Sequence, residues 1–224
     1  MSPDSHLREA LDRGLRTLAH AGTPVGDIGE QERDRLIRLV ALLGKWNKVY
    51  NLTAVRDARQ MVDRHLLDSL VMTRWLPDAQ AGDPAVYDVM DVGTGAGLPV
   101  LPLALVRPDL RFLSVESNGK KTRFQQQAVL ELGLTNVTVL QERIENVNDR
   151  ARLVLSRAFT APVDFLRIAQ ALCVPEGKVA VMLGRAERLP DSLQPHYELR
   201  ELVEVAVPGT DSARHVALCQ RQYG

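Results

Sequence analysis

The sequence lacks the features of secreted, membrane-bound or disulfide-linked proteins. It has only two cysteines, Cys173 and Cys219, and both stand in apolar stretches, so a disulfide framework is not expected. No uninterrupted apolar run approaches the ~20 residues that cross a bilayer. The amino terminus has no basic and then apolar signal pattern. We therefore expect a cytoplasmic protein without a membrane segment.

Net charge is also absent, because 28 Lys and Arg residues balance 28 Asp and Glu residues. Such a chain has no overall field that would draw it to nucleic acid or to a membrane. A nucleic-acid partner would therefore require a local basic patch. Residues 45–74 hold six basic and three acidic residues, and Lys120, Lys121 and Arg123 form a second basic cluster. For either cluster alone, a solvated helix face is the alternative.

Periodicity divides the chain into two parts. Apolar residues recur at helical spacing in residues 31–50 and 57–75, whereas short β-branched runs alternate with helical patterns from residue 85 onward. Strands are expected at Val86–Val92, Leu110–Glu116, Val137–Leu140, Arg152–Ser156, Lys178–Leu183, Tyr197–Val207 and His215–Arg221, and helices at Pro99–Arg107, Lys120–Leu132 and Pro162–Cys173. We predict an α/β fold in which an N-terminal helical cap (1–84) packs on a doubly wound, mostly parallel, seven-stranded Rossmann-like sheet (85–224).

A glycine-rich loop follows the first predicted strand. In Asp91–Gly97, three glycines permit a tight turn and let a ligand lie against the backbone. A dinucleotide-binding G-x-G-x-x-G loop would need glycine where this chain has Leu98. Asp91 would repel a pyrophosphate, but it could meet the cationic end of a zwitterionic ligand. The loop therefore favours S-adenosylmethionine over a dinucleotide.

Two further segments fit the nucleoside part of such a ligand. Glu116 ends the second predicted strand, about 20 residues beyond the loop, where an acid can accept hydrogen bonds from ribose hydroxyls. The alternative is an exposed acid at a strand end. Residues 141–145 follow the third strand, where an adenine edge would lie, although a solvated turn is the alternative.

Together with Lys45–Thr53 and Arg64–Ser69, these motifs resemble the bacterial RsmG family, also called glucose-inhibited division protein B. The similarity runs from about Gln31 to the C-terminus and includes Gly97-Leu98-Pro99, Val106-Arg107-Pro108, Gly119-Lys120-Lys121 and Leu155–Phe159. It implies a class I methyltransferase that uses S-adenosylmethionine to methylate N7 of guanine-527 in 16S ribosomal RNA of the small ribosomal subunit. We expect a monomer.

The resemblance implies two groups of site residues. Those assigned to the cofactor are Asp91, Gly93, Thr94, Gly95, Gly97, Leu98, Glu116, Glu142, Arg143, Ile144 and Arg157. Those assigned to RNA are Asn47, Asn51, His65, Lys120, Arg123 and Arg185. Arg157 is also expected to position the substrate, and its role and that of Arg123 are not separated between cofactor carboxylate and RNA phosphate. No metal is expected.

The chain departs from the family pattern after the fifth strand. Family members usually carry a Lys-Gly pair there, and this sequence has Leu183-Gly184. Arg185 follows two positions beyond the expected lysine, and whether it covers the same phosphate stays open.

Methylation at guanine N7 needs few catalytic groups. N7 has a lone pair and no proton, so no general base is required, and positioning and electrostatics would supply the rate. Because the purine gains positive charge, Arg157 suits a phosphate or guanine O6 better than the reacting nitrogen.

His65, Asp68 and Ser69 share a helical face, either as a structural cluster or as part of the substrate pocket. Trp46 could stack on a base or belong to the core.

Three other functions remain open. A methyltransferase of the same fold could act on another RNA, a protein or a small molecule. A nicotinamide oxidoreductase is disfavoured by Leu98 and Asp91. A non-catalytic RNA-binding protein could retain the nucleotide pocket.

Overall fold

Helices form the first third of the chain in the computed structural model, which describes residues 3–80, 82–157, 160–184, 197–210 and 214–222. In chain order they are α1 (Pro3–His20), α2 (Glu30–Tyr50), α3 (Ala58–Met61), the π-helix η1 (Val62–Leu67), α4 (Asp68–Leu70) and the 3₁₀ helix η2 (Val71–Trp75). The predicted helix over residues 31–50 is confirmed as α2. Among the described helices, none is both long enough and apolar enough to span a membrane.

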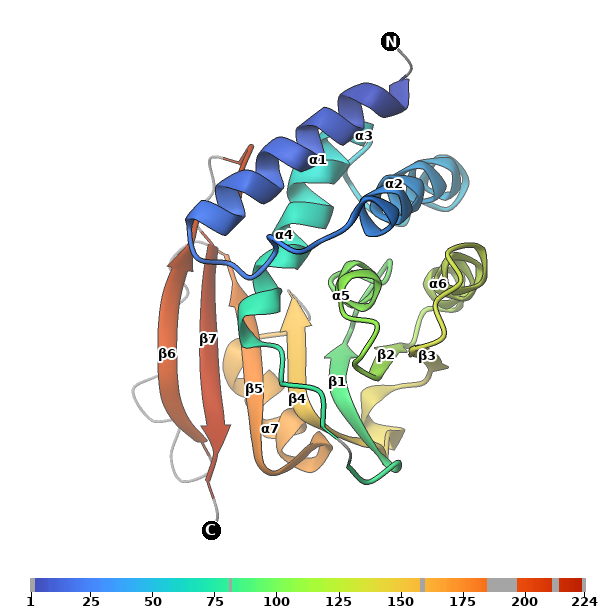
Figure 1. Cartoon of the computed structure of the whole chain (residues 1–224). Helices are drawn as coiled ribbons and strands as arrows, with labels where there is room; N and C mark the ends of the chain where they lie inside the picture. The colour runs from blue at the N-terminus through green and yellow to red at the C-terminus, as the bar shows by residue number, and fades with distance from the viewer. Residues whose placement is uncertain (1–2, 81, 158–159, 185–196, 211–213, 223–224) are drawn as a thin grey trace.

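The sequence patterns above assign no element to the first thirty residues, yet α1 lies there. Leu11, Leu15 and Leu18 recur at helical spacing in it, and each is less than 5% exposed. The helix packs on α2 and η1 (Figure 1). Its apolar face is therefore part of the main hydrophobic core.

The predicted helical segment 57–75 is helical but is not one regular helix. Asp57 begins it, because its side chain accepts a hydrogen bond from the Gln60 amide at 2.9 Å. The π turn of η1 interrupts the α geometry, and Asp63 and His65 are both buried there. Residues that are two apart lie on nearly opposite sides of a helix. Both sides of this turn are covered, because α1 and α2 pack on η1 and Gly209 lies against the Asp63 carboxyl.

The second part of the chain forms a seven-stranded sheet with the order β3-β2-β1-β4-β5-β7-β6. Its strands are β1 (Val86–Val92), β2 (Phe112–Glu116), β3 (Val137–Gln141), β4 (Arg150–Arg157), β5 (Cys173–Leu183), β6 (Tyr197–Val205) and β7 (Arg214–Arg221). Strands β1 to β5 pair in parallel, and β7 pairs antiparallel with both β5 and β6. The prediction of a doubly wound, mostly parallel sheet is confirmed.

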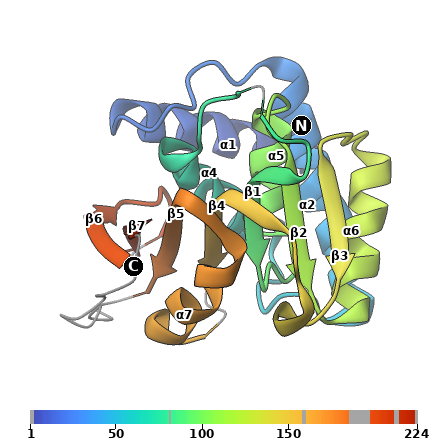
Figure 2. The same ribbon diagram turned by 90° about the horizontal axis from the view of Figure 1, so that it is seen from below.

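Helices cover both faces of this sheet. The connecting helices are α5 (Val100–Val106), α6 (Gly119–Glu131) and α7 (Pro162–Leu172). Figures 1 and 2 show α5 and α6 on the face that also carries α1 and α2, and α7 on the other face. In β5, Ala180 and Met182 join the core on the first side, whereas Val179, Val181 and Leu183 join the core on the second. This alternation explains why the strand reads as a continuous apolar run.

Several predicted boundaries differ from the observed ones by one or two residues, and the start of β5 differs by more. Pro99 was expected inside the first turn of a helix, but it is the N-cap and α5 begins at Val100. Cys173 was expected at the end of a helix, but it begins β5 and pairs with Ala151. Between Cys173 and the expected strand start, Glu176 adopts a φ of 62°, and the pairing with β4 shifts register there. Because the irregularity breaks the strand pattern before Lys178, the sequence does not predict that the strand begins as early as Cys173.

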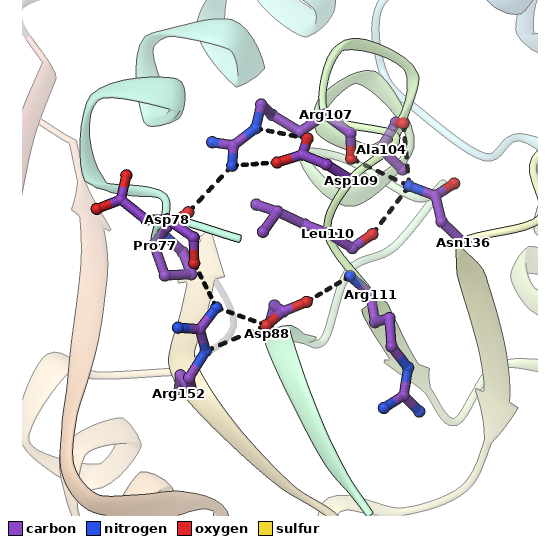
Figure 3. Close-up of polar contacts among 10 residues, drawn as sticks. All are labelled: Pro77, Asp78, Asp88, Ala104, Arg107, Asp109, Leu110, Arg111, Asn136 and Arg152. Atoms are coloured by element: carbon purple, nitrogen blue, oxygen red, sulfur yellow. Dashed lines mark hydrogen bonds and ion pairs between the residues drawn. The ribbon is translucent and has the colours of Figure 1, made fainter. Parts of the chain in front are cut away.

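A polar network closes the amino edge of the sheet, as Figure 3 shows. Asp88 of β1 accepts hydrogen bonds from the Arg152 guanidinium of β4 at 2.6 Å and from the Arg111 amide at 2.7 Å. The Asn136 Nδ2 amide lies 3.1–3.2 Å from three carbonyl oxygens at the end of α5 and in the turn after it. Arg107 pairs with Asp109 at 2.7 Å. This edge is thus tied by polar contacts, while the carboxyl edge carries the cavities.

Candidate active site

Two adjoining cavities lie at the carboxyl edge of the parallel strands. The first cavity, of about 610 Å³, is lined by Gly93, Val115, Glu116, Ser117, Lys121, Gln141, Glu142, Arg143, Ile144 and Glu145. The second cavity, of about 420 Å³, is lined by Leu52, Thr53, His65, Asp68, Gly93, Thr94, Gly95, Ala96, Leu98, Lys121, Arg157, Met182, Leu183, Gly184 and Arg214. Gly93 and Lys121 line both, so the cavities meet there. Ligands bind at this edge in open α/β sheets.

The glycine loop lines the second cavity, and its Gly93 also lines the first. Gly93, Gly95 and Gly97 have φ values of 68°, 64° and 77°, a region that other residues rarely adopt. Gly93 and Gly95 line cavities, as the sequence predicts for ligand contacts. Gly97 lines neither, and a Cβ atom there would lie 2.4 Å from the Leu101 side chain. Gly97 therefore lets the loop pack on α5.

A buried polar relay, absent from the sequence prediction, supports this loop. The Ser114 hydroxyl of β2 donates to Gln125 Oε1 at 2.6 Å, and Gln125 Nε2 donates to the Gly95 carbonyl at 2.7 Å. Ser114 and Gln125 are both 0% exposed. Because water does not reach them, the loss of either partner leaves buried polar groups unsatisfied.

Glu116 ties the loop to the end of β2. Its Oε2 accepts from the Gly95 amide at 2.9 Å, and its Oε1 accepts from the Asn118 amide at 2.8 Å. Lys121 Nζ lies 3.8 Å from Oε2. Each carboxylate oxygen keeps a further lone pair. Glu116 lines the first cavity and can accept ribose hydroxyls, as the sequence suggests.

Asp91, expected to contact the ligand, lies beneath the loop. It is 0% exposed and lines neither cavity, and its Oδ2 accepts from the Val100 amide at 3.2 Å. Burial raises the pKa of Asp91 to about 7. Asp91 Oδ1 and the Thr94 hydroxyl are both buried, and the hydroxyl counters part of this rise as a hydrogen-bond donor to the carboxyl. Asp91 therefore supports the loop from beneath, at Thr94 and at Val100.

A buried carboxylate bridges two arginines on the wall of the second cavity. Asp68 Oδ2 pairs with Arg157 of β4 at 2.9 Å, and Asp68 Oδ1 pairs with Arg214 of β7 at 3.0 Å. The Asp68 side chain is only 3% exposed, so it holds both guanidinium groups in fixed places. Arg214 does not figure in the sequence prediction. Its local pattern, an arginine at the start of a strand, carries no functional signal.

His65 is neutral and has both ring nitrogens engaged. Burial, followed by the charge of Arg157, lowers the pKa of His65 to about 4. Nδ1 lies 3.0 Å from the Arg64 carbonyl, which can only accept, so Nδ1 carries the proton. Nε2 therefore accepts from the Thr53 hydroxyl at 2.9 Å. His65 lines the cavity as a positioning group with no free nitrogen.

The residues assigned to RNA by resemblance lie in different surroundings. Asn47 is buried: its Nδ2 donates to the Val55 carbonyl and its Oδ1 accepts from the Thr53 amide, both at 2.9 Å. These bonds use the side chain, which was expected to contact RNA, to shape the loop after α2. Asn51, Lys120 and Arg123 are exposed and line neither cavity, and Arg185 lies outside the described residues. Leu183, at the position of the expected lysine, lines the second cavity.

The sheet order, the glycine loop and the cavities at the carboxyl edge define the class of the protein: a Rossmann-like methyltransferase fold. A SAM-dependent methyltransferase from Aquifex aeolicus superimposes on 71% of this chain and 92% of its own length, with a TM-score of 0.52 and 16% sequence identity.

Sequence similarity identifies the family. The sequence model of the rRNA small subunit methyltransferase G family matches residues 32–216. Relatives named Ribosomal RNA small subunit methyltransferase G include one from Neisseria meningitidis serogroup C, 41% identical over 88% of this chain and 92% of its own. Another, from Chromohalobacter salexigens, is 42% identical over 99% of this chain and 100% of its own. The chain belongs to the rRNA small subunit methyltransferase G family.

Proposed function

We propose that this chain transfers the methyl group of S-adenosylmethionine to N7 of a guanine in 16S ribosomal RNA, in the small ribosomal subunit or its precursor. Family membership supports the reaction class and the RNA. The single structural observation behind the proposal is the pair of cavities that meet at Gly93 and Lys121. One has a carboxylate suited to a ribose, and the other has two arginines suited to a nucleotide.

The first cavity and the loop would hold the cofactor. We assign Gly93, Thr94, Gly95 and Leu98 to contacts along the loop and Glu116 to the ribose hydroxyls. Glu142, Arg143 and Ile144 line the far part of the first cavity and are assigned to the adenine. When bound, S-adenosylmethionine supplies an electrophilic methyl group on a sulfonium.

The second cavity would hold the guanine without a general base. N7 of guanine attacks through a lone pair and loses no proton, so no residue has to accept one. The neutral, fully bonded His65 matches that requirement. The rate enhancement then comes from holding the guanine in line with the methyl group.

Arg157 would position the substrate through a phosphate or guanine O6. The purine becomes positively charged during transfer, so a free guanidinium against its reacting edge would oppose the reaction. Asp68 draws Arg157 toward the cavity wall and neutralises part of its charge. Arg214, held by the same carboxylate, is a second candidate for a phosphate contact.

We place the activity in the cytoplasm and expect a monomer. Cys173 and Cys219 are both free and buried, as suits a reducing compartment.

The test is transfer of labelled methyl from S-adenosylmethionine to small ribosomal subunits that lack the modification, followed by mapping of the labelled base. We expect label at one guanine N7. Label at another atom or in another RNA would reject the assigned target, and cofactor binding without transfer would reject the enzymatic function. Arg157→Ala should lower kcat/KM about tenfold or more. Because Asp68 then loses one of its two cationic partners, the variant also loses stability, so its activity is measured where urea unfolding shows it to be folded.

A further inference from the structure

An exposed apolar spot lies beside the second cavity at the end of α2. Val49 is 69% exposed and Tyr50 is 41% exposed, although both are large hydrophobic residues. Leu52 and Thr53, which follow directly in the chain, line the second cavity. The spot therefore stands two residues along the chain from the lining of the proposed guanine pocket.

The Tyr50 ring rests on an aromatic support. Its centroid lies 5.2 Å from that of Trp46, with the ring planes 35° apart. Trp46 is half-buried and makes an edge contact with Phe124 of α6, at a centroid distance of 5.8 Å. Trp46 thus packs between α2 and α6, whereas Tyr50 presents its ring to solvent. Of the two alternatives for Trp46, this position favours the core.

The turn that carries Tyr50 is fixed in place. Asn51 caps α2 in the left-handed region with a φ of 53°. Arg56 donates to the Asn47 carbonyl at 3.2 Å and to Asn51 Oδ1 at 2.6 Å, so the two sides of the turn are joined. A ring held in this way loses little conformational freedom when it binds a flat ligand.

Unpaired cations stand on the two helices that are joined by the contacts among Tyr50, Trp46 and Phe124. Lys45 and Lys48 of α2 and Lys120 and Arg123 of α6 are exposed, and within the described part of the chain none of them forms an ion pair. The nearby acids along the chain are already engaged: Asp57 caps α3, Asp63 pairs with Arg59, and Asp68 pairs with two arginines. These three are the acidic residues of positions 45–74, which also hold six basic residues.

We propose that Tyr50 is a stacking platform for an unpaired base of the RNA strand next to the target guanine. The inference rests on the proposed function, since it assumes that the guanine enters the second cavity. A flat apolar face on a pair of helices that also carry unpaired cations matches a single-stranded nucleic acid, in which exposed bases alternate with phosphates. Stacking accepts any base, so Tyr50 contributes affinity and does not select the sequence.

The first experiment measures kcat and KM for unmethylated small subunits with Tyr50→Ala, Tyr50→Leu and Tyr50→Phe. Leucine covers Trp46 but has no aromatic face, whereas phenylalanine keeps one. We expect KM to rise about tenfold in the Ala and Leu variants, with kcat and the cofactor Kd within twofold of wild type and Phe close to wild type. Leu130→Ala, at a 75% exposed position of α6, is the matched control and should change neither constant.

A wild-type KM in Tyr50→Leu would overturn the stacking role while leaving the proposed function intact. Failure of the wild-type protein to methylate the subunits would instead remove the proposed function. As a second readout, p-benzoylphenylalanine at position 50 should crosslink to 16S RNA near the methylated guanine. A crosslink to a ribosomal protein, or none to the subunit, would overturn the RNA assignment.

Discussion

Gln125 is the residue through which α6 holds the cofactor loop. Its side chain satisfies both the Ser114 hydroxyl and the Gly95 carbonyl in a place without water. Gln125→Leu leaves both groups unpaired, so we expect a loss of about 1–3 kcal/mol in the free energy of unfolding. We also expect about tenfold weaker binding of S-adenosylmethionine, because the loop loses a support. Urea unfolding and calorimetric titration measure the two effects.

The neighbouring Gln126 provides a matched control. It is exposed on the same helix, so Gln126→Leu should leave both measurements near wild type. Equal cofactor affinity in the two variants would show that the loop keeps its shape without the relay.

Asp91 makes stability depend on pH in an unusual direction. Its pKa is raised from 3.8 to about 7 by burial, so between these values the folded protein holds a proton that the unfolded chain has lost. The contribution of this group to the free energy of unfolding therefore falls as pH rises toward 7, by at most about 1.4 kcal/mol per pH unit. Above pH 7 it changes no further.

Asp91→Asn should remove that slope while keeping an acceptor for the Val100 amide. The stability difference, variant minus wild type, should increase from pH 5 to pH 7 and then level off. Urea unfolding across pH 5–8.5 gives this difference directly. A constant difference would mean that Asp91 stays ionised throughout the range.

At the residue scale, local motifs predict only part of the candidate site. The glycine loop and Glu116 lie at strand ends that the sequence pattern locates, and the structure brings them to one edge. Arg214 and Gln125 escape prediction because their roles depend on partners far along the chain: Asp68 for one and Gly95 for the other. For Asn47 the motif suggests an exposed polar residue, whereas the structure shows that its side chain is buried.

The turn between β6 and β7 is pressed against η1. Gly209 has a φ of 77°, and a Cβ atom there would lie 2.4 Å from the Asp63 carboxyl carbon. Gly209→Ala would therefore push the turn away from η1 and disturb Arg214, five residues on, which pairs with Asp68. We expect a kcat/KM at least about tenfold lower in the methylation assay, because the cavity wall shifts.

Gly22→Ala is the control, because it introduces backbone strain without a steric clash. Gly22 has a φ of 82°, and no atom lies within 4 Å of the place that a Cβ atom would take, so Gly22→Ala carries the strain of about 1–2 kcal/mol alone. Its methylation kinetics should match wild type. Equal losses of activity in the two alanine variants would exclude a special role for the contact with Asp63.

Strands and most helices were predictable at the element scale because they alternate in a regular βαβ pattern. β1 was predicted with its observed bounds, and α6 to within one residue at each end. The π turn was not predictable, because it depends on tertiary contacts that hold Asp63 and His65 inward and leaves the apolar period of the segment almost unchanged. α1 was also predictable in principle, because its leucines recur at helical spacing.

The N-terminal helices and the sheet share one core on the whole-molecule scale. Leu11 of α1 belongs to the same buried cluster as Leu153 and Leu155 of β4. Leu11→Ala should cost about 2–5 kcal/mol, and the loss should extend to the sheet. Amide hydrogen exchange measures this: protection of β4 should fall together with that of α1. Loss of protection confined to α1 would show that residues 1–84 and 85–224 unfold as separate domains.

The place of β7 between β5 and β6 sets an order of events during synthesis. β6 leaves the ribosome before β7, yet it has no strand to pair with until β7 is complete. Until then β5 is a bare edge, and its apolar stretch Val179–Leu183 is open to pairing with other nascent chains. A pause in translation between residues 205 and 221 would therefore prolong the period in which the newborn chain is most prone to aggregate and most in need of a chaperone.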